Sequence, residues 1–283
     1  MNIAGVVVLY NPTEQVLENI QTYLPFLRKL YVMDNSTKEL DFTDKIKELE
    51  KVEYISLGGN HGIAKALKIG TEKSIEENYD YVLSMDQDSK YPTEDFKYIE
   101  DYLEKCDISK VGAIGINFSG NRISVLSTDK SYVEKNHLLI TSGMIIVSQN
   151  YKKIYGYNED LFIDWVDDDV CMQLLHFGFE LILFRNILLE HSLGIMETRK
   201  FLFLKVTKGW HSDLRLYYIF RNGTYLKKYK KEYFIKSQKN RINFLHRVYK
   251  VIFSSNRRKT LKMIKMGIKD GKNAKLGVYT PKD

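Results

Sequence analysis

The sequence contains few cysteines and no long apolar run, and each absence excludes a class of protein. Cys106 and Cys171 are the only cysteines among 283 residues, too few for a disulfide framework, so a reducing compartment is predicted. No run of about 18 apolar residues is present to span a bilayer, and no basic segment precedes the first apolar run at residues 3–11. These absences predict a cytoplasmic protein.

The charges are distributed unevenly along the chain. Residues 225–283 carry 18 Lys and Arg against 3 Asp and Glu, whereas residues 1–224 carry 25 against 33. A uniform nucleic-acid groove does not predict this segregation, and no RNP, KH or zinc motif is present, so nucleic acid is not an expected partner. A basic appendage that holds an acidic body against an anionic surface explains the pattern better.

Short apolar runs and helical patterns alternate in the first ninety residues. The apolar runs occupy residues 5–10, 30–35, 52–57 and 81–86, and runs of this kind are typical of strands buried on both faces. Their order predicts an α/β fold with a mainly parallel central sheet flanked by helices. From about residue 212 the pattern is helical and basic, so we expect a catalytic domain over 1–211 and a helical region over 212–283.

Polar residues stand where the predicted strands end. In open parallel sheets, ligands bind outside the carboxyl ends of the strands, so these side chains should converge on one crevice. Tyr10 and Asn11 also suit an ordinary turn that leads into Pro12. The residues are Tyr10, Asn11, Asp34, Asn35, Asp86 and Asp88.

The acidic pair Asp86-Gln87-Asp88 admits several interpretations. The two carboxylates could solvate a loop or cap the next helix. A calcium loop of the EF-hand type is excluded, because Tyr91 and Lys97 stand where that loop needs Gly and Glu. Two carboxylates one residue apart can also offer one to Mg²⁺ or Mn²⁺ and the other to a ribose, as in a nucleotide diphosphate site.

A haloacid-dehalogenase-type phosphatase is a rival interpretation of the same pair. Such enzymes also place an Asp-x-Asp after an apolar strand, and the acids at 167–169 could imitate their later metal ligands. Their motif generally ends the first strand of the sheet, however, whereas here three strand and helix units precede it. A nucleotide-binding half is therefore favoured.

A second acidic cluster begins a predicted helix that Gly178 ends. Acids in a first helical turn interact favourably with the positive end of the helix dipole, and Asp164 is a possible N-cap. Capping does not need four acids, so one of them could also act as a general base for transfer to a hydroxyl group. The cluster comprises Asp164, Asp167, Asp168 and Asp169.

Seven motifs follow one another along the chain: VVVLYN, VMDNS, GGNHGIAKALKIG, SMDQDS, FIDWVDDDVCMQLLHFGF, EHSLG and HSDLRLYYIFRN. In this order they resemble family 2 glycosyltransferases of the GT-A fold, and in particular bacterial rhamnosyltransferases of surface-polysaccharide synthesis. The resemblance covers most of the chain. It implies a nucleotide-diphospho-sugar transferase fold with a basic helical C-terminal extension.

The resemblance also implies roles for individual residues. Asp86 would lie near the donor ribose and Asp88 would hold the metal, with His191 as a second metal ligand. Asp167 would be the general base, with Asp168 as the alternative. The remaining donor-binding residues would be Tyr10, Asn11, Asp34, Asn35 and Gln87, and contacts to phosphate or acceptor would come from Asp169, His211 and Arg215.

The expected activity is therefore inverting, metal-dependent transfer of a sugar, with L-rhamnose from dTDP-rhamnose as the best guess, to a lipid-linked or polysaccharide acceptor. Another donor, such as UDP-galactofuranose or UDP-glucose, is the alternative, and a non-catalytic nucleotide-sugar or membrane-binding protein is the alternative from another class. Residues 241–253 have the pattern of a basic amphipathic helix, which suits an anionic leaflet or a helix packed on the body. We expect peripheral attachment to the inner face of the cytoplasmic membrane.

Overall fold

The computed structural model describes residues 1–118, 128–191, 196–201 and 204–281. The four strands predicted in the first ninety residues are all present and form one parallel block in the order β3-β2-β1-β4. Their bounds are Ile3–Leu9 (β1), Lys29–Asp34 (β2), Val52–Ser56 (β3) and Tyr81–Asp86 (β4).

The second half of the sheet mixes strand directions. β8 (Met144–Val147) runs antiparallel between β4 and β6 (Val111–Phe118), and β9 (Glu180–His191) pairs parallel with β6. The short strands β5 (Ser89–Lys90) and β7 (Val133–Lys135) pair antiparallel with β9. Six of the nine strands in the described sheet therefore point the same way, which confirms the mainly parallel α/β fold.

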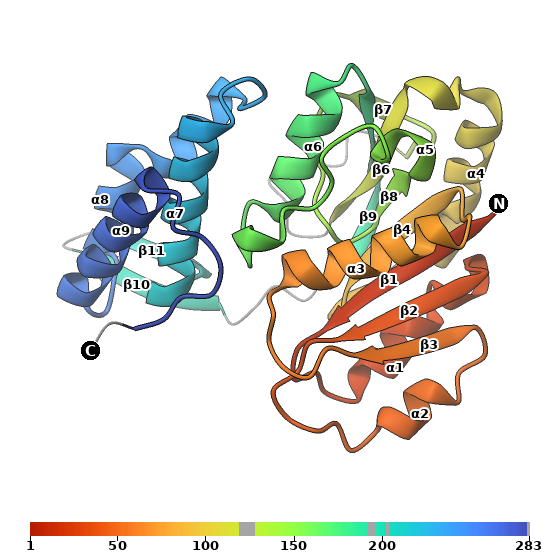
Figure 1. Cartoon of the computed structure of the whole chain (residues 1–283), viewed down its shortest axis with the longest axis horizontal. Helices are drawn as coiled ribbons and strands as arrows, with labels where there is room; N and C mark the ends of the chain where they lie inside the picture. Colours follow the sequence, from red (N-terminus) through yellow and green to blue (C-terminus); the bar gives the residue numbers. More distant parts are fainter. Residues whose placement is uncertain (119–127, 192–195, 202–203, 282–283) are drawn as a thin grey trace.

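Helices cover both faces of the sheet, as the continuous apolar strands require (Figure 1). On one face, α1 (Gln15–Gln21), α2 (Thr43–Lys47) and α4 (Phe96–Lys105) pack on strand residues such as Val7. On the other face, α3 (Ile63–Glu76), α5 (Ser148–Tyr151) and α6 (Val166–His176) pack on residues such as Val6. Short 3-10 helices lie at Leu24–Phe26, Thr93–Asp95, Ile108–Lys110, Glu159–Leu161 and Lys236–Ile242.

The acidic helix follows its predicted pattern except at its two ends. Val170 and Leu174 are buried, and Gly178, with φ of +86°, follows the helix as its predicted stop. Phe177 lies just after the helix and is 40% exposed. Asp164 is not the N-cap, because Trp165 occupies that position.

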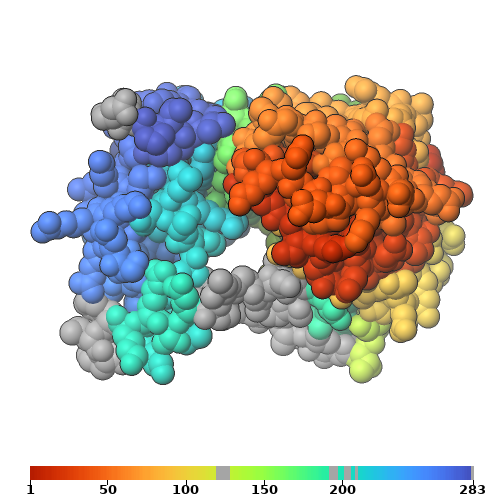
Figure 2. Space-filling view, turned by 90° about the horizontal axis from the view of Figure 1, so that it is seen from below, coloured from red at the N-terminus to blue at the C-terminus, as the bar shows by residue number. Residues whose placement is uncertain are grey.

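A smaller part of the molecule follows the sheet. It contains the hairpin of β10 (Met196–Phe201) and β11 (Leu204–Gly209) and the helices α7 (Asp213–Tyr229), α8 (Phe244–Ile252) and α9 (Arg257–Lys272). A Cβ at Gly267 or Gly271 would clash with carbonyl oxygens of α7, so glycine permits the close approach of α9 and α7. Figure 2 shows an open gap between this part and the N-terminal strands.

The hairpin lies against the C-terminal helices. Arg199 of β10 donates a hydrogen bond to the Phe253 carbonyl, and Trp210 stacks on the rings of Tyr249 and Phe253. The sequence placed the end of the catalytic domain at residue 211, but these contacts associate β10 and Trp210 with the helical part (Figure 1). Within the described ranges, no helix has the length and apolar character needed to cross a bilayer.

Candidate active site

The ends of β1 and β2 are joined through Asn11. Its backbone N–H donates to Ser36 Oγ at 2.8 Å, and its side-chain oxygen accepts from the Thr37 N–H at 3.1 Å. Asn11 has φ of 44°, a left-handed conformation that asparagine tolerates better than most residues. Asn11, which was predicted to bind the donor, therefore uses its backbone N–H and its side-chain oxygen to hold the two loops together.

Asp34 and Asn35 are both buried at the end of β2 and have partners within the protein. Asp34 accepts hydrogen bonds from the Tyr54 hydroxyl and, at 3.0 Å, from the Ser36 N–H. Asn35 accepts from the His61 N–H at 2.7 Å and donates to Asn60 at 3.2 Å. The two side chains thus hold the loops around the crevice, including the glycine-rich loop before α3.

Gln87 connects the ends of β1 and β4. Its side chain accepts from the Tyr10 N–H at 2.7 Å and donates to the Tyr10 carbonyl at 3.3 Å. Asn19 of α1 donates to the Gln87 carbonyl, and Ser142 accepts from the Asp86 N–H. The backbone on both sides of the acidic pair is therefore fixed, while the Tyr10 ring remains 47% exposed beside it.

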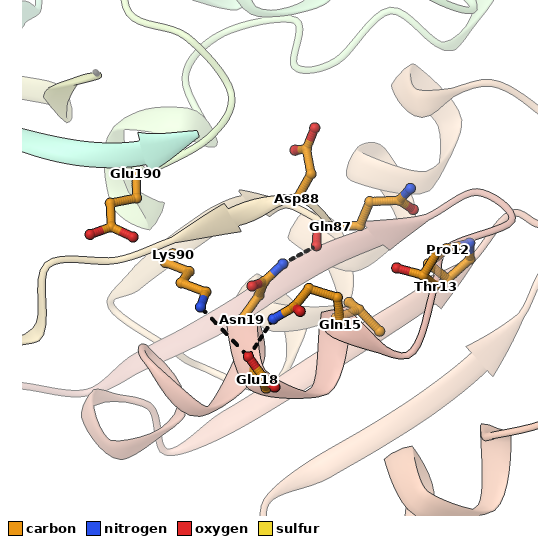
Figure 3. A pocket seen from close by; sticks show the side chains of 10 residues that line it. Pro12, Thr13, Gln15, Glu18, Asn19, Gln87, Asp88, Lys90 and Glu190 are labelled. Atoms are coloured by element: carbon orange, nitrogen blue, oxygen red, sulfur yellow. Dashed lines mark hydrogen bonds and ion pairs between the residues drawn. The ribbon is translucent and has the colours of Figure 1, made fainter. Parts of the chain in front are cut away.

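A cleft of about 610 Å³ opens beside the acidic pair, between α1 and the β4–β5 turn. Figure 3 shows the Asp88 carboxylate pointing away from Lys90 and Glu18, which form an ion pair at 3.7 Å on the wall of the cleft. Glu190 of β9 lies across the cleft from α1 (Figure 3). The cleft gives Asp88 an exposed setting in which it can meet a ligand.

The loop before α6 has an unusual backbone. Phe162, Asp164 and Trp165 all have φ near +65°, the left-handed region that costs a non-glycine residue on the order of 1–3 kcal/mol. The side-chain amide of Asn222 donates to the carbonyls of residues 161, 163 and 164, each at 2.9 Å. Trp165 donates from Nε1 to the Ile219 carbonyl at 2.9 Å. Helix α7 therefore holds this loop in place.

Arg221 supports the same loop from within the protein. It is 1% exposed, and its guanidinium donates to the carbonyls of Asp160, Leu161 and Gly277. Arg221 and Asn222 both lie in the HSDLRLYYIFRN motif, but no role was predicted for either of them. An adjacent Arg-Asn pair among apolar helix residues is the signal that could have indicated buried backbone partners.

Asp167 has the most perturbed carboxyl group of the acidic loop. Burial, together with the charges of Asp168 and Asp86, raises its pKa to about 7. The influence of Asp86 means that the acid at the end of β4 and the acid at the start of α6 are electrostatic neighbours. The structure therefore brings the two acidic motifs of the sequence to one site.

Asp168 differs from Asp167 in having a cation as partner. It forms an ion pair with Arg241, whose guanidinium also lies 4.2 Å from the centre of the Trp165 ring. We expected residues 241–253 to form a basic amphipathic helix that faces an anionic leaflet or packs on the body. Arg241 lies in the 3-10 helix before α8 and points into the acidic loop, and Lys250 of α8 is only 7% exposed.

Asp169 and Asp164 point to different neighbours. Asp169 is 1% exposed and accepts from the Tyr233 hydroxyl at 3.0 Å and from Gln173 at 2.9 Å, while burial raises its pKa to about 6. Asp164 accepts from Arg215 Nε at 3.2 Å. These contacts tie the acidic helix to the C-terminal part and do not place Asp169 in the cleft.

The remaining predicted residues lie around the site at different distances. The backbone of His191 pairs with Ser89, next to Asp88, but its side chain lies outside the described residues. His211 lines a separate cavity in the C-terminal part. No cluster of three or more acidic, His or Cys side chains suited to a metal occurs among the described residues.

The acidic pair nevertheless suits a divalent cation that arrives with a substrate. Mg²⁺ is commonly held by one or two carboxylates together with substrate phosphates and water, rather than by a complete protein cage. Asp86 and Asp88 supply two hard oxygen donors of this kind at one strand end. The residues present therefore fit a metal that is shared with a diphosphate.

Comparisons with known proteins agree with this architecture. The profile of glycosyl transferase family 2 matches residues 6–164. The dTDP-rhamnosyl transferase RfbF of Shigella flexneri is 28% identical to this chain over 270 residues, which cover 89% of this chain and 86% of RfbF. The sequence resemblance to rhamnosyltransferases is thereby confirmed.

Two solved structures have a similar fold at low sequence identity. TarS 1-349 of S. aureus in complex with UDP-GlcNAc has a TM-score of 0.55 at 12% identity, with 97% of this chain and 92% of that chain covered. GalNAc-T7 with UDP, GalNAc and Mn²⁺ has a TM-score of 0.53 at 12% identity; the match covers 67% of this chain and 43% of GalNAc-T7. The fold is that of GT-A glycosyltransferases. The chain belongs to glycosyl transferase family 2 and is a glycosyltransferase.

Proposed function

We propose that the protein transfers L-rhamnose from dTDP-rhamnose to a lipid-linked or polysaccharide acceptor, with inversion at the anomeric carbon and with a divalent metal. The observation that carries the proposal is the influence of the Asp86 charge on the pKa of Asp167, which is raised to about 7, because it links a diphosphate-type acidic pair to a carboxyl group that can accept a proton. The identity to RfbF supports the rhamnose donor.

In this proposal the nucleotide binds where β1, β2 and β4 end. The exposed ring of Tyr10 offers a surface to the base, while Asn11, Asp34, Asn35 and Gln87 keep the surrounding loops in place through their hydrogen bonds. Asp86 lies near the ribose. The crevice at the carboxyl ends of parallel strands is the usual ligand site of such sheets.

Asp88 and His191 would hold Mg²⁺ or Mn²⁺, with Asp86 beside them. A bound divalent cation stabilises negative charge on the departing nucleotide diphosphate. The protein's own contribution is a fixed backbone: Gln87, Asn19 and Ser142 hold the acidic pair from three sides. That arrangement reduces the reorganisation needed when the donor binds.

Asp167 acts as the general base. As the acceptor oxygen bonds to the anomeric carbon, the bond from that carbon to the diphosphate breaks, and the acceptor proton moves to the Asp167 carboxylate. A base is most effective when its pKa lies near the working pH, which a value of about 7 satisfies. Asp168 is the weaker choice because its carboxylate is paired with Arg241.

The basic C-terminal part is proposed to attach the enzyme to the inner face of the cytoplasmic membrane. Phe244 and Leu245 at the start of α8 are 67% and 74% exposed, and the first turn of α9 contains Arg257 and Arg258. Apolar side chains beside basic ones bind anionic lipid surfaces. Arg241 and Lys250 do not contribute, because they point inward.

The proposal is tested by thermal unfolding of the purified protein with dTDP, UDP, dTDP-rhamnose, UDP-galactofuranose and UDP-glucose, each with Mn²⁺, Mg²⁺ or EDTA. We expect a metal-dependent rise in Tm with dTDP and dTDP-rhamnose that is absent in Asp88→Ala. Selectivity for UDP would replace rhamnose with another donor sugar. No response from folded protein to any nucleotide would contradict the donor site.

A transfer assay distinguishes an active enzyme from a protein that only binds the nucleotide-sugar. A nucleotide response together with no transfer to any membrane extract would favour a non-catalytic nucleotide-sugar-binding protein. The presence of both Asp88 and Asp167 favours an active enzyme, so we expect transfer of radiolabelled rhamnose to the lipid fraction of such an extract.

A further inference from the structure

A second cavity lies in the C-terminal part of the molecule. Its volume is about 670 Å³, and it is bounded by the first turns of α7 and α9, the end of α8 and the β10 strand. None of the residues that line it belongs to the nine-stranded sheet. It is therefore separate from the strand-end crevice in which we place the donor.

The wall of this C-terminal cavity carries an excess of positive charge. Lys250 and Lys259 line it, and Lys250 is 7% exposed, whereas Arg199 on the same wall forms an ion pair with Glu197 at 3.0 Å. Asp213 is the only acid among the described lining residues, and its carboxylate accepts a hydrogen bond from the Thr260 hydroxyl. The cavity therefore favours an anion.

Two helix N-termini border the same cavity and add to this preference. Ser212 caps α7 through the Arg215 N–H, and Asn256 caps α9 through the Lys259 N–H. Both helices are long, with 17 and 16 residues, and the positive ends of helix dipoles favour phosphate groups. Together with Lys250 and Lys259, they define the phosphate end of a binding site.

Another part of the lining is apolar or aromatic. Trp210, Leu216, Met263 and Tyr279 contribute to it, and Leu214 is 43% exposed at the first turn of α7. An inorganic anion or a free sugar would leave this surface without a partner. The chemistry fits a phosphate that carries an apolar chain.

The cavity is connected to the acidic loop by two direct contacts. Arg215, next to Leu214, bonds to Asp164 at 3.2 Å. Tyr279 donates its N–H to the Tyr218 hydroxyl at 2.8 Å, and the Tyr218 ring stacks on Phe162 with centroids 5.0 Å apart. Helix α7 therefore contacts both the cavity and the loop that precedes Asp167.

We propose that the C-terminal cavity binds a phosphate or diphosphate group carrying an apolar chain, as the anchor of the acceptor. The assignment rests on the proposed transfer reaction and specifies its acceptor class: a glycan or alcohol joined through phosphate to a lipid. The anchor is held by Lys250 and Lys259, and the acceptor hydroxyl extends past Arg215 toward Asp167.

The test is calorimetric titration of the full chain with farnesyl diphosphate and with inorganic diphosphate. We expect saturable binding of farnesyl diphosphate and at least tenfold weaker binding of inorganic diphosphate. Lys259→Glu should weaken farnesyl diphosphate binding by at least tenfold. The variant is expected to fold, because Lys259 is exposed and an acid in a first helical turn is favourable.

The matched control is Lys262→Glu, which makes the same charge change on α9 but does not line the C-terminal cavity. It should bind like the unchanged protein. Equal weakening in both variants, or equal affinity for the two ligands, would overturn the proposal.

A competition experiment distinguishes the two sources of a lipid phosphate. Vesicles of phosphatidylglycerol should not displace farnesyl diphosphate; displacement that depends on Lys259 would identify a bilayer headgroup and overturn the acceptor assignment. The Tm response to dTDP with Mn²⁺ should persist in Lys259→Glu. Its absence in the unchanged protein would contradict the donor site, whatever the result with farnesyl diphosphate.

Discussion

The strand-end crevice and the acidic loop are both acidic, but the protein builds them differently. In the crevice, polar side chains bond to neighbouring strand ends or to the loop that follows. Gln87 accepts a hydrogen bond from the Tyr10 N–H, and Asn35 accepts one from the His61 N–H. The acidic loop is held by side chains 50 to 75 residues downstream, including Asn222 and Arg241. The crevice is thus a product of the sheet, whereas the loop depends on the C-terminal part.

This difference assigns distinct tasks to the two regions. A crevice fixed by the sheet can bind a nucleotide without help from elsewhere. A loop with three left-handed residues keeps its shape only while α7 supports it. The C-terminal part is therefore expected to control catalysis more than donor binding.

The largest expected effect is that of Asp167→Asn. Removal of a general base lowers kcat by about 10²–10⁴-fold, while the Tm response to nucleotide and metal should remain, because the crevice is intact. The rate of nucleotide diphosphate release measures kcat, and thermal unfolding with nucleotide and metal measures donor binding. Asp168→Asn is the control; if it alone abolished turnover, the base would be Asp168.

Asn222→Ala should loosen the acidic loop without altering the crevice. The Asn222 amide has two N–H groups for its three carbonyl partners, and the Leu161 carbonyl keeps its bond from Arg221. The loss of two hydrogen bonds at about 1 kcal/mol each therefore lowers the free energy of unfolding by about 2 kcal/mol. Urea denaturation measures this loss, and kcat should fall more than nucleotide affinity.

The control for Asn222→Ala is Asn243→Ala, which removes the cap of α8 and should cost about 1 kcal/mol without changing kcat. Equal losses of stability in the two variants would mean that Asn222 contributes no more than an ordinary cap. That outcome would contradict the dependence of the loop on α7.

Arg241→Gln should shift the pH dependence of turnover. Asp167 must be ionised to accept a proton, so the rate falls as the pH drops through its pKa of about 7. The Arg241 charge lowers that pKa, and its loss raises it, so the acid limb of the profile should move to higher pH.

A profile of kcat against pH for Arg241→Gln and for Arg247→Gln checks this shift. Arg247 lies over the Phe244 ring rather than against the acidic loop, so its loss should leave the acid limb in place. An unchanged profile in Arg241→Gln would separate Arg241 from the catalytic carboxyl group.

Gln87→Ala should have the smallest effect. It removes two hydrogen bonds between β4 and β1 at a partly exposed position, worth about 1 kcal/mol, so we expect about a fivefold rise in the donor KM. The kcat should hardly change. Gln15→Ala, on the wall of the adjacent cleft, is the control. A fall in kcat with unchanged KM would show that Gln87 acts in catalysis.

The sheet and the crevice were predictable because their signals are local. Apolar runs such as 81–86 determine the strands, and parallel strands bring Asp34 and Asp86 to one edge. The antiparallel strand β8 lay in the apolar run at 137–148, but its direction follows from pairing with β4, which no local pattern records.

The support of the acidic loop was not predictable from local patterns. Arg241 has the spacing of a basic amphipathic helix, and only the path of the chain brings it to Asp168, 73 residues earlier. Similarly, the left-handed backbone at Phe162 and Trp165 is imposed by bonds from α7 rather than by glycine at those positions. In this region, long-range contacts determine the backbone conformation more than the local propensities of the residues do.

The most direct test is a crystal structure of the protein with dTDP and Mn²⁺, with the metal located by its anomalous scattering. We expect Mn²⁺ between the diphosphate and Asp88, the thymine ring beside Tyr10, and the diphosphate end of the nucleotide directed toward Asp167. Nucleotide bound in the C-terminal cavity, or Mn²⁺ bound away from Asp86 and Asp88, would contradict it.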